Sequence, residues 1–214
     1  MKKIGLIIGV ILAFSCVLNA QEKVLCFGDS ITFGTHIEGK YTKDISWVSI
    51  LQEKSKGKLE CINAGRSGRK ACQWQEMLKY TQKYKEVDRV IIFLGVNDLR
   101  KSTEEVLNNC VKSVDEMVKL SRKAYGENVK ILILGSPGLL IGHVSANFHK
   151  QGFDANEQKM LDRLRGLYAA YAKENKCGFL DLWEVISPEN YHDGLHPTVK
   201  GQEQMADVIL KKMK

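Results

Sequence analysis

A serine near the start of the chain and a histidine with an aspartate near its end could together perform nucleophilic catalysis. Ser30 follows the apolar run 24–27, and Asp193 stands three residues before His196. A nucleophilic hydroxyl needs a base within hydrogen-bond reach and a third group that orients this base. The sequence therefore predicts a triad with Ser30 as nucleophile, His196 as base, and Asp193 as acceptor of the second imidazole proton.

Two further polar clusters offer donors for the oxyanion that this nucleophile would generate. Gly65 follows the apolar run 59–62, and Asn97 follows the run 90–94. The backbone N–H of Ser30, the N–H of Gly65 and the side-chain amide of Asn97 would converge on the substrate carbonyl oxygen. Glycine at position 65 would let the backbone approach closely. We expect these three residues to form an oxyanion hole.

Metal binding is the alternative for the histidine cluster, because histidines four residues apart can bind a metal from one helical face. His192 and His196 have this spacing, but Gly194 lies between them and Pro197 follows directly. The segment is therefore more typical of a turn that leads into a final helix. We expect no metal and no other cofactor.

The elements that must position these residues follow from the hydrophobic pattern. Short apolar runs predict buried strands at 24–27, 59–62, 90–94, 129–134 and 178–182. Helical spacing predicts helices at 45–54, 73–83, 103–125, 157–175 and about 198–213. Alternating strands and helices indicate one three-layer α/β/α domain with a five-stranded parallel sheet. The ligand of such a sheet lies beyond the carboxyl ends of its strands, where the polar clusters follow.

The four clusters, in this order, resemble the SGNH (GDSL) hydrolase superfamily, which is named for its Ser, Gly, Asn and His. The resemblance extends from about residue 24 to the final helix. It implies a flavodoxin-like fold, an esterase without a cofactor, and the same catalytic and oxyanion-hole roles for Ser30, Gly65, Asn97, Asp193 and His196. Several segments are also similar to secreted arylesterase and acyltransferase-like members, namely 28–34, Trp47, 65–69 and 90–98. The segment 139–153 departs from that pattern.

The first twenty residues have the features of an export signal. Lys2 and Lys3 precede the apolar run 4–18, which is shorter than the roughly 20 residues that a spanning helix needs. We expect cleavage after Ala20, export to the periplasm or the exterior, and a mature domain at 21–214 without a membrane span. Acylation of Cys16, as in a bacterial lipoprotein, remains an open alternative.

Composition narrows the class of protein further. The chain of 214 residues is 44% hydrophobic and 27% charged, which is typical of a globular domain. The net charge is +7, and its lysines are scattered without interleaved aromatic residues, so we expect no nucleic-acid partner. Five cysteines follow the export signal, and this odd number without a close pair indicates neither a disulfide framework nor a zinc knuckle, although one disulfide stays possible.

The polar loops after the strands bear on the substrate. The segments 66–69 and 143–150 carry hydroxyl, imidazole and guanidinium groups and offer no long apolar groove for an acyl chain. We therefore expect an exported serine esterase that hydrolyses short acyl esters, such as acetyl esters on a carbohydrate. A lipase, thioesterase or acyltransferase of the same superfamily and a non-catalytic carbohydrate- or lipid-binding module are the alternatives. The oligomeric state is left open.

Overall fold

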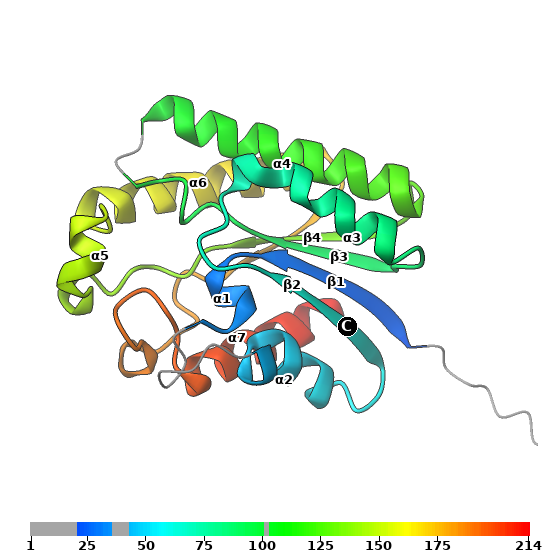
Figure 1. Cartoon of the computed structure of the whole chain (residues 1–214), viewed down its shortest axis with the longest axis horizontal. Coiled ribbons are helices and arrows are strands. Elements are labelled where there is room, and N and C mark those ends of the chain that lie inside the picture. Colours follow the sequence, from blue (N-terminus) through cyan, green and yellow to red (C-terminus); the bar gives the residue numbers. More distant parts are fainter. Residues whose placement is uncertain (1–20, 36–42, 101–102) are drawn as a thin grey trace, which may run out of the picture.

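The apolar runs of the sequence form a sheet of five parallel strands in the computed structural model, which describes residues 21–35, 43–100 and 103–214. The expected export signal at 1–20, with Cys16, lies outside these residues. The strands are β1 (Glu22–Gly28), β2 (Leu59–Gly65), β3 (Arg89–Phe93), β4 (Lys130–Gly135) and β5 (Gly178–Asp181), in the spatial order β2-β1-β3-β4-β5. The predicted α/β fold with a five-stranded parallel sheet is confirmed (Figure 1).

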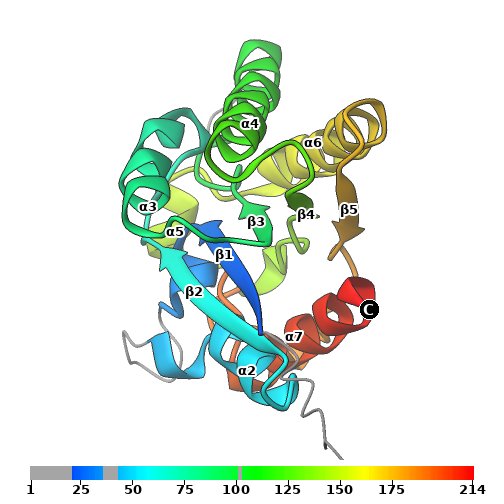
Figure 2. The ribbon, with the colours of Figure 1, turned by 90° about the vertical axis from the view of Figure 1, so that its right-hand side faces the viewer.

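Helices cover both faces of this sheet. The α-helices are α1 (Ser30–Phe33), α2 (Trp47–Lys54), α3 (Leu78–Lys83), α4 (Glu104–Tyr125), α5 (Ala146–Lys150), α6 (Ala155–Glu174) and α7 (Val199–Met213). Short 3-10 helices, η1 to η4, occupy Lys43–Ile45, Ala71–Met77, Ile141–His143 and Pro188–Asn190. Helices α2 and α7 lie on one face, and α3, α4 and α6 lie on the other (Figure 2). The three layers predicted from the sequence are therefore present.

The central strand β1 shows why the strands are continuous apolar runs. Successive side chains of a strand point to opposite faces, so a strand covered on both sides needs apolar residues throughout. Val24 and Cys26 pack in the core beneath α2 and α7, whereas Leu25 and Phe27 pack in the core beneath α4 and α6. All four side chains are fully buried.

Some local elements differ from those predicted. The predicted helix 73–83 is split into a 3-10 segment, η2, and the α-helix α3, with a break in the helical backbone at Gln73. The hydrophobic pattern gave no sign of the short helices α1 and α5, because four or five residues are too few to show a helical period.

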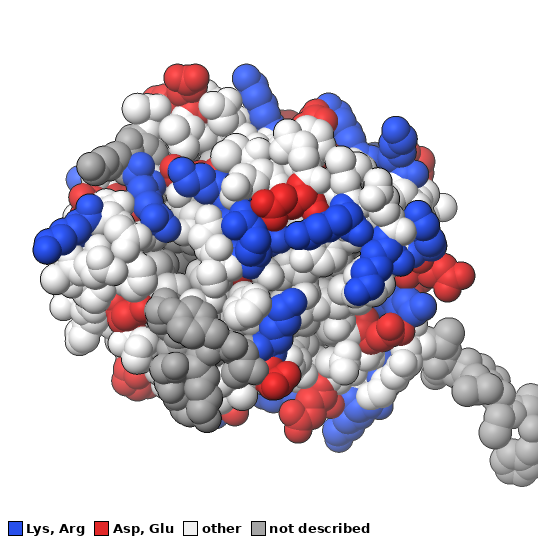
Figure 3. Space-filling view, viewed as in Figure 1, with Lys and Arg blue, Asp and Glu red and all other residues white. Residues whose placement is uncertain are grey.

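The surface and the cysteines add two observations. Lys and Arg side chains are spread over the face shown in Figure 3, with acidic and uncharged residues among them. The cysteines at 26, 61, 72, 110 and 177 are free thiols, and Cys26 and Cys110 are buried. Within the described part of the chain, no helix is both long and apolar enough to cross a bilayer.

Candidate active site

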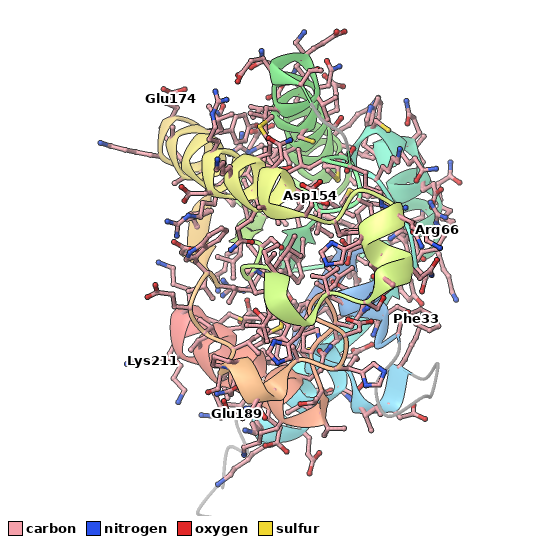
Figure 4. All side chains as sticks on the ribbon, turned by 90° about the vertical axis from the view of Figure 1, so that its left-hand side faces the viewer. Phe33, Arg66, Asp154, Glu174, Glu189 and Lys211 are labelled. Carbon is pink, nitrogen blue, oxygen red and sulfur yellow. The ribbon has the colours of Figure 1, made fainter. Side chains whose placement is uncertain are left out.

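The carboxyl ends of the central strands bring the polar clusters together. Gly28 at the end of β1 pairs with Gly65 of β2 on one side and with Phe93 of β3 on the other. Ser30 begins α1 directly after β1, and Asn97 follows β3 in a turn. The expected clusters thus share one edge of the sheet. Figure 4 looks onto this edge, and the labelled Phe33, after Ser30, and Arg66, after Gly65, lie near each other in that view.

Ser30, His196 and Asp193 form a continuous series of hydrogen bonds. Nε2 of His196 lies 3.0 Å from Oγ of Ser30, and Nδ1 of His196 lies 2.8 Å from Oδ2 of Asp193. Since an ionised carboxylate only accepts hydrogen bonds, Nδ1 carries the proton and Nε2 is left to accept the proton of the Ser30 hydroxyl. Ser30 and His196 are 6% and 3% exposed. The structure therefore brings the three residues of the predicted triad together.

The carboxylate of Asp193 is held in its charged form. Burial raises its pKa, but the hydrogen bond and charge of His196, with the backbone N–H groups of His196 and Leu195, outweigh burial and hold the pKa at about 2. Oδ1 accepts those backbone N–H groups at 2.7 Å and 3.0 Å. The orienting group is therefore ionised across the neutral pH range.

The loop that carries Asp193 and His196 is a turn, as the sequence predicted. Tyr191 pairs with Pro197 across it, and the N–H of His192 donates to the carbonyl of His196 at 2.8 Å. Because no helix spans these residues, His192 and His196 do not share a helical face. Within the described residues, no group of three His, Cys, Asp or Glu side chains is arranged to hold a metal.

The second cluster is tied to the sheet by Arg69, a contact that the sequence analysis did not anticipate. The Arg69 side chain is fully buried and lies over the ring of Phe27 at 4.1 Å. Its NH1 group donates to the carbonyls of Gly28 and Ala64, at the ends of β1 and β2. The arginine therefore fixes the loop after β2 beside the loop that carries Ser30.

Gly65, an expected oxyanion donor, lies at the end of β2 against the backbone of α1. Its N–H donates to Oδ1 of Asn63 at 2.9 Å, so this hydrogen is already used. A Cβ at position 65 would lie 2.3 Å from the backbone nitrogen of Phe33, and the glycine therefore permits the close approach of α1 to β2. The close approach expected at Gly65 was toward the substrate oxygen, whereas the structure shows one between β2 and α1.

Gly68 has the free N–H that Gly65 lacks. No described residue accepts a hydrogen bond from it, and a Cβ at this position would meet no atom of the described residues within 4 Å. Its φ of +72° lies in the left-handed region that glycine tolerates best. Gly68 follows Ser67, whose hydroxyl bonds that of Thr35 just after α1. The loop therefore presents an unused donor beside the residues that follow Ser30.

Asn97 is buried next to the nucleophile with its carboxamide nitrogen toward the first two clusters. Nδ2 lies 3.4 Å from Oδ2 of Asp29 and 3.2 Å from the carbonyl oxygen of Arg69. Asp29 itself caps α1 by accepting the N–H of Ile31 at 3.0 Å. Burial raises the pKa of Asp29 to about 6, against the opposing effects of the Ile31 N–H and the charges of His196 and Arg69. The amide of Asn97 therefore contacts Asp29, the residue directly before Ser30.

The segment 139–153, which departed from the family pattern, packs on the loop that carries Asp193 and His196. The N–H of Leu140 donates to the carbonyl of Gly194 at 2.8 Å, and the N–H of Ser145 donates to that of Asp193 at 3.3 Å. The ring of Phe148, in α5, lies 5.5 Å from the ring of His196. This segment therefore forms one wall beside the base, a feature that no sequence period could reveal.

Comparisons with known proteins agree with this geometry. The model of the GDSL-like Lipase/Acylhydrolase family matches residues 26–204. A curated relative, the acetylxylan esterase of Xylanibacter ruminicola, is 24% identical over 220 residues, which cover 90% of this chain and 43% of the relative. The chain therefore spans less than half the length of that relative.

Solved structures show the same fold. A carbohydrate acetylesterase family member from Sinorhizobium meliloti matches with a TM-score of 0.75 and 24% identity, over 90% of this chain and 99% of that one. The aryl esterase of M. smegmatis matches with a TM-score of 0.74 and 24% identity, over 90% and 98% of the two chains.

Proposed function

The chain belongs to the GDSL-like lipase/acylhydrolase family, and from this premise we propose that it hydrolyses carboxylic esters through an acyl-enzyme at Ser30. The observation that carries the proposal is the series of hydrogen bonds from Ser30 through His196 to Asp193 at the carboxyl edge of the sheet. A hydroxyl, an imidazole and an ionised carboxylate in this order are the parts that nucleophilic acyl transfer requires.

The acylation step uses Ser30 and His196. As Oγ of Ser30 bonds to the ester carbonyl carbon, its proton passes to Nε2 of His196, and the carbonyl electron pair moves onto oxygen. Asp193 stabilises the imidazolium that forms. When the carbonyl reforms, the bond to the alcohol oxygen breaks, and this oxygen takes the proton from Nε2. The products of this step are the free alcohol and an ester on Ser30.

Deacylation repeats the sequence with water. His196 removes a proton from a water molecule, whose oxygen bonds to the acyl carbon, and the bond to Oγ of Ser30 then breaks. Oγ recovers the proton from Nε2, and the carboxylic acid is released. The same base therefore serves both halves of the reaction, which needs no cofactor.

The oxyanion of each tetrahedral intermediate requires donors whose hydrogens are free or held only in long hydrogen bonds to the protein, as those of Asn97 Nδ2 are at 3.2 and 3.4 Å. We assign this role to the N–H of Ser30, to Nδ2 of Asn97 and to the N–H of Gly68. Gly68 takes the place that the sequence analysis gave to Gly65, because the Gly65 N–H is bonded to Asn63. The contact of Nδ2 with the Arg69 carbonyl supports a position of Asn97 beside this loop.

We infer that the substrate is a short acyl ester, such as an acetyl ester, with a hydroxylated alcohol portion such as a carbohydrate. The buried serine and histidine and the Phe148 ring beside the base support a small acyl group. The names of two relatives, an acetylxylan esterase and a carbohydrate acetylesterase family member, support the alcohol portion. Export, cleavage after Ala20 and a mature domain at 21–214 remain part of the proposal.

Covalent labelling tests the nucleophile. An organophosphate should add one phosphoryl group to the wild-type chain, at Ser30, and abolish aryl-acetate hydrolysis. The Ser30→Ala variant should take up no label, while a matched Ser67→Ala variant should still be labelled. A fully folded wild-type chain that neither reacts nor turns over any ester would overturn the enzyme proposal and favour a binding module.

A substrate series tests the acyl and alcohol portions. Aryl esters of rising acyl length should show kcat/KM falling beyond about four carbons, because a short pocket cannot collect about 0.8 kcal/mol per added methylene. O-acetylated sugars should release acetate. A maximum at eight or more carbons would contradict the short-acyl proposal and favour a lipase or thioesterase, and a transfer product in added alcohol would favour an acyltransferase.

A further inference from the structure

Asn97 is held from the side opposite to the nucleophile by an arginine three residues later in the chain. The NH2 group of Arg100 donates to Oδ1 of Asn97 at 2.6 Å. The carboxamide nitrogen of Asn97 bonds the acceptors Asp29 Oδ2 and the Arg69 carbonyl. The oxygen of this amide therefore contacts a donor, and its nitrogen contacts two acceptors.

Only one orientation of the Asn97 carboxamide satisfies all of these contacts. Rotating it by half a turn would point its NH2 group at the Arg100 guanidinium, which only donates, and its oxygen at the Asp29 carboxyl group and the Arg69 carbonyl. Hydrogen bonds to an ionised donor are roughly twice as strong as neutral ones, so Arg100 supplies much of this preference. In the flipped orientation the oxygen would repel a substrate oxyanion.

Arg100 is itself fixed by residues outside the catalytic machinery. Its NH1 group donates to Oε1 of Gln151 at 3.1 Å, and its guanidinium lies 4.7 Å from the centre of the Phe153 ring. The segment between α5 and α6 thus holds Arg100, and Arg100 holds Asn97. Figure 4 shows this segment, near the labelled Asp154, at the edge of the sheet that carries the site.

We propose that Arg100 is a positioning residue, which orients and polarises the Asn97 carboxamide so that Nδ2 faces the oxyanion. The inference rests on the proposed function, because it concerns the same ester hydrolysis. Bonding at the amide oxygen draws electron density from the nitrogen and makes its N–H groups stronger donors. An oxyanion donor acts in the transition state and not on the bound ester, so Arg100 should affect kcat and leave KM nearly unchanged.

A double-mutant cycle on aryl-acetate hydrolysis tests this assignment. Removing one oxyanion donor typically lowers kcat by about a hundredfold to a thousandfold, and we expect this for Asn97→Ala. Arg100→Met, which keeps the bulk and removes the donors, should lower kcat by roughly tenfold to a hundredfold at nearly constant KM. In the Asn97→Ala background the same change should have almost no effect, since Arg100 acts through Asn97. Arg163→Met, which breaks only the exposed pair with Glu104, is the matched control.

A second, more conservative variant keeps the inference testable if Arg100→Met does not fold. If Arg100→Met does not fold, Arg100→Lys keeps the charge beside Phe153 but cannot reach Asn97 and Gln151 together, and should lose several-fold in kcat only when Asn97 is present. Near wild-type kcat in both Arg100 variants, or equal losses with and without Asn97, would overturn the inference. A folded wild-type chain without activity or serine labelling would instead overturn the proposed function, so the two failures are distinguishable.

Discussion

The ring of Phe148 packs against the ring of His196, with 5.5 Å between their centroids and 53° between their planes. Phe148 also meets Phe153 edge to face at 5.6 Å. Because His196 contacts both Ser30 and Phe148, an ester bound at Ser30 must lie close to this aromatic wall. The wall comes from the segment 139–153, which departs from the family pattern.

Shortening this wall should change the acyl preference. In Phe148→Ala we expect the ratio of kcat/KM for an eight-carbon ester to that for the acetate ester to rise about tenfold, because the space left beside His196 can bury additional methylenes. Aryl-ester kinetics measure this ratio. The control Leu167→Ala removes an exposed side chain far along α6 and should leave the ratio unchanged. An unaltered ratio in Phe148→Ala would show that the acyl group lies elsewhere.

The triad residues should behave as one unit. Ser30→Ala and His196→Ala should each reduce kcat to the background of the assay, and the double variant should be no slower than either, since each residue is useless without the other. Asp193→Asn should lose less, because its carboxamide oxygen can still accept one hydrogen bond. Pre-steady-state kinetics with an aryl acetate would check these values. Independent, multiplying losses would be incompatible with the proposed mechanism.

The two glycines of the second cluster should respond differently to alanine. Gly65→Ala should lower the free energy of unfolding by about 3 kcal/mol or prevent folding, because its Cβ would meet the Phe33 backbone. Gly68→Ala has room and should cost only about 1 to 2 kcal/mol for its positive φ, while kcat falls through displacement of the N–H. Urea unfolding and kinetics separate the two effects. If Gly65→Ala were stable and selectively slow, Gly65 would be the oxyanion donor after all.

Glu157 should make the stability of the domain depend on pH. Burial raises the pKa of this carboxyl group from 4.5 to about 8, against the opposing charge of Arg100. The folded chain then binds the proton more tightly than the unfolded chain, so this contribution to stability is present below about pH 4.5 and is lost as the pH rises through about 8. Glu157→Gln should therefore exceed the wild type in unfolding free energy by several kcal/mol at pH 8.5 and match it near pH 4.5.

Thermal and urea unfolding across this pH range would measure the effect. The matched control is Glu174→Gln, an exposed position in the last turn of the same helix, which should follow the wild-type curve. Parallel curves for the wild type and Glu157→Gln would mean that the Glu157 carboxyl group is not held neutral in the folded chain.

The sequence predicted the sheet because a strand that is buried on both faces is a continuous run of apolar residues, which is easy to recognise. Val24 to Phe27 and Val90 to Phe93 are apolar without interruption, which is the pattern of a strand covered on both sides. The triad could also be predicted from the sequence, because Asp193 and His196 are close in the sequence and the predicted sheet has its strand ends, one of them before Ser30, at one edge. Both predictions depended on short-range patterns.

The contacts that the sequence did not predict are individual hydrogen bonds made by side chains of the loops. Nothing in the types or spacing of Asn63 and Gly65 shows that one side chain consumes the N–H of the other. Two further contacts depend in the same way on loop conformation: the hydrogen bonds of buried Arg69 to two carbonyls and the hydrogen bond from Arg100 to Asn97. Such contacts are set by the folded backbone, which composition and periodicity do not specify.

The last helix adds a consequence for the order of events during synthesis. Gln202 in α7 accepts the N–H of Trp47 at 2.8 Å and donates to the carbonyl of Ile31 at 3.3 Å, so it joins α1 and α2. A growing chain contains all five strands and Ser30 before the loop with His196 has been made. Under the proposed mechanism, Ser30 would acquire its base only when the segment with Asp193 and His196 docks. A chain that lacks this segment would therefore carry an unreactive serine.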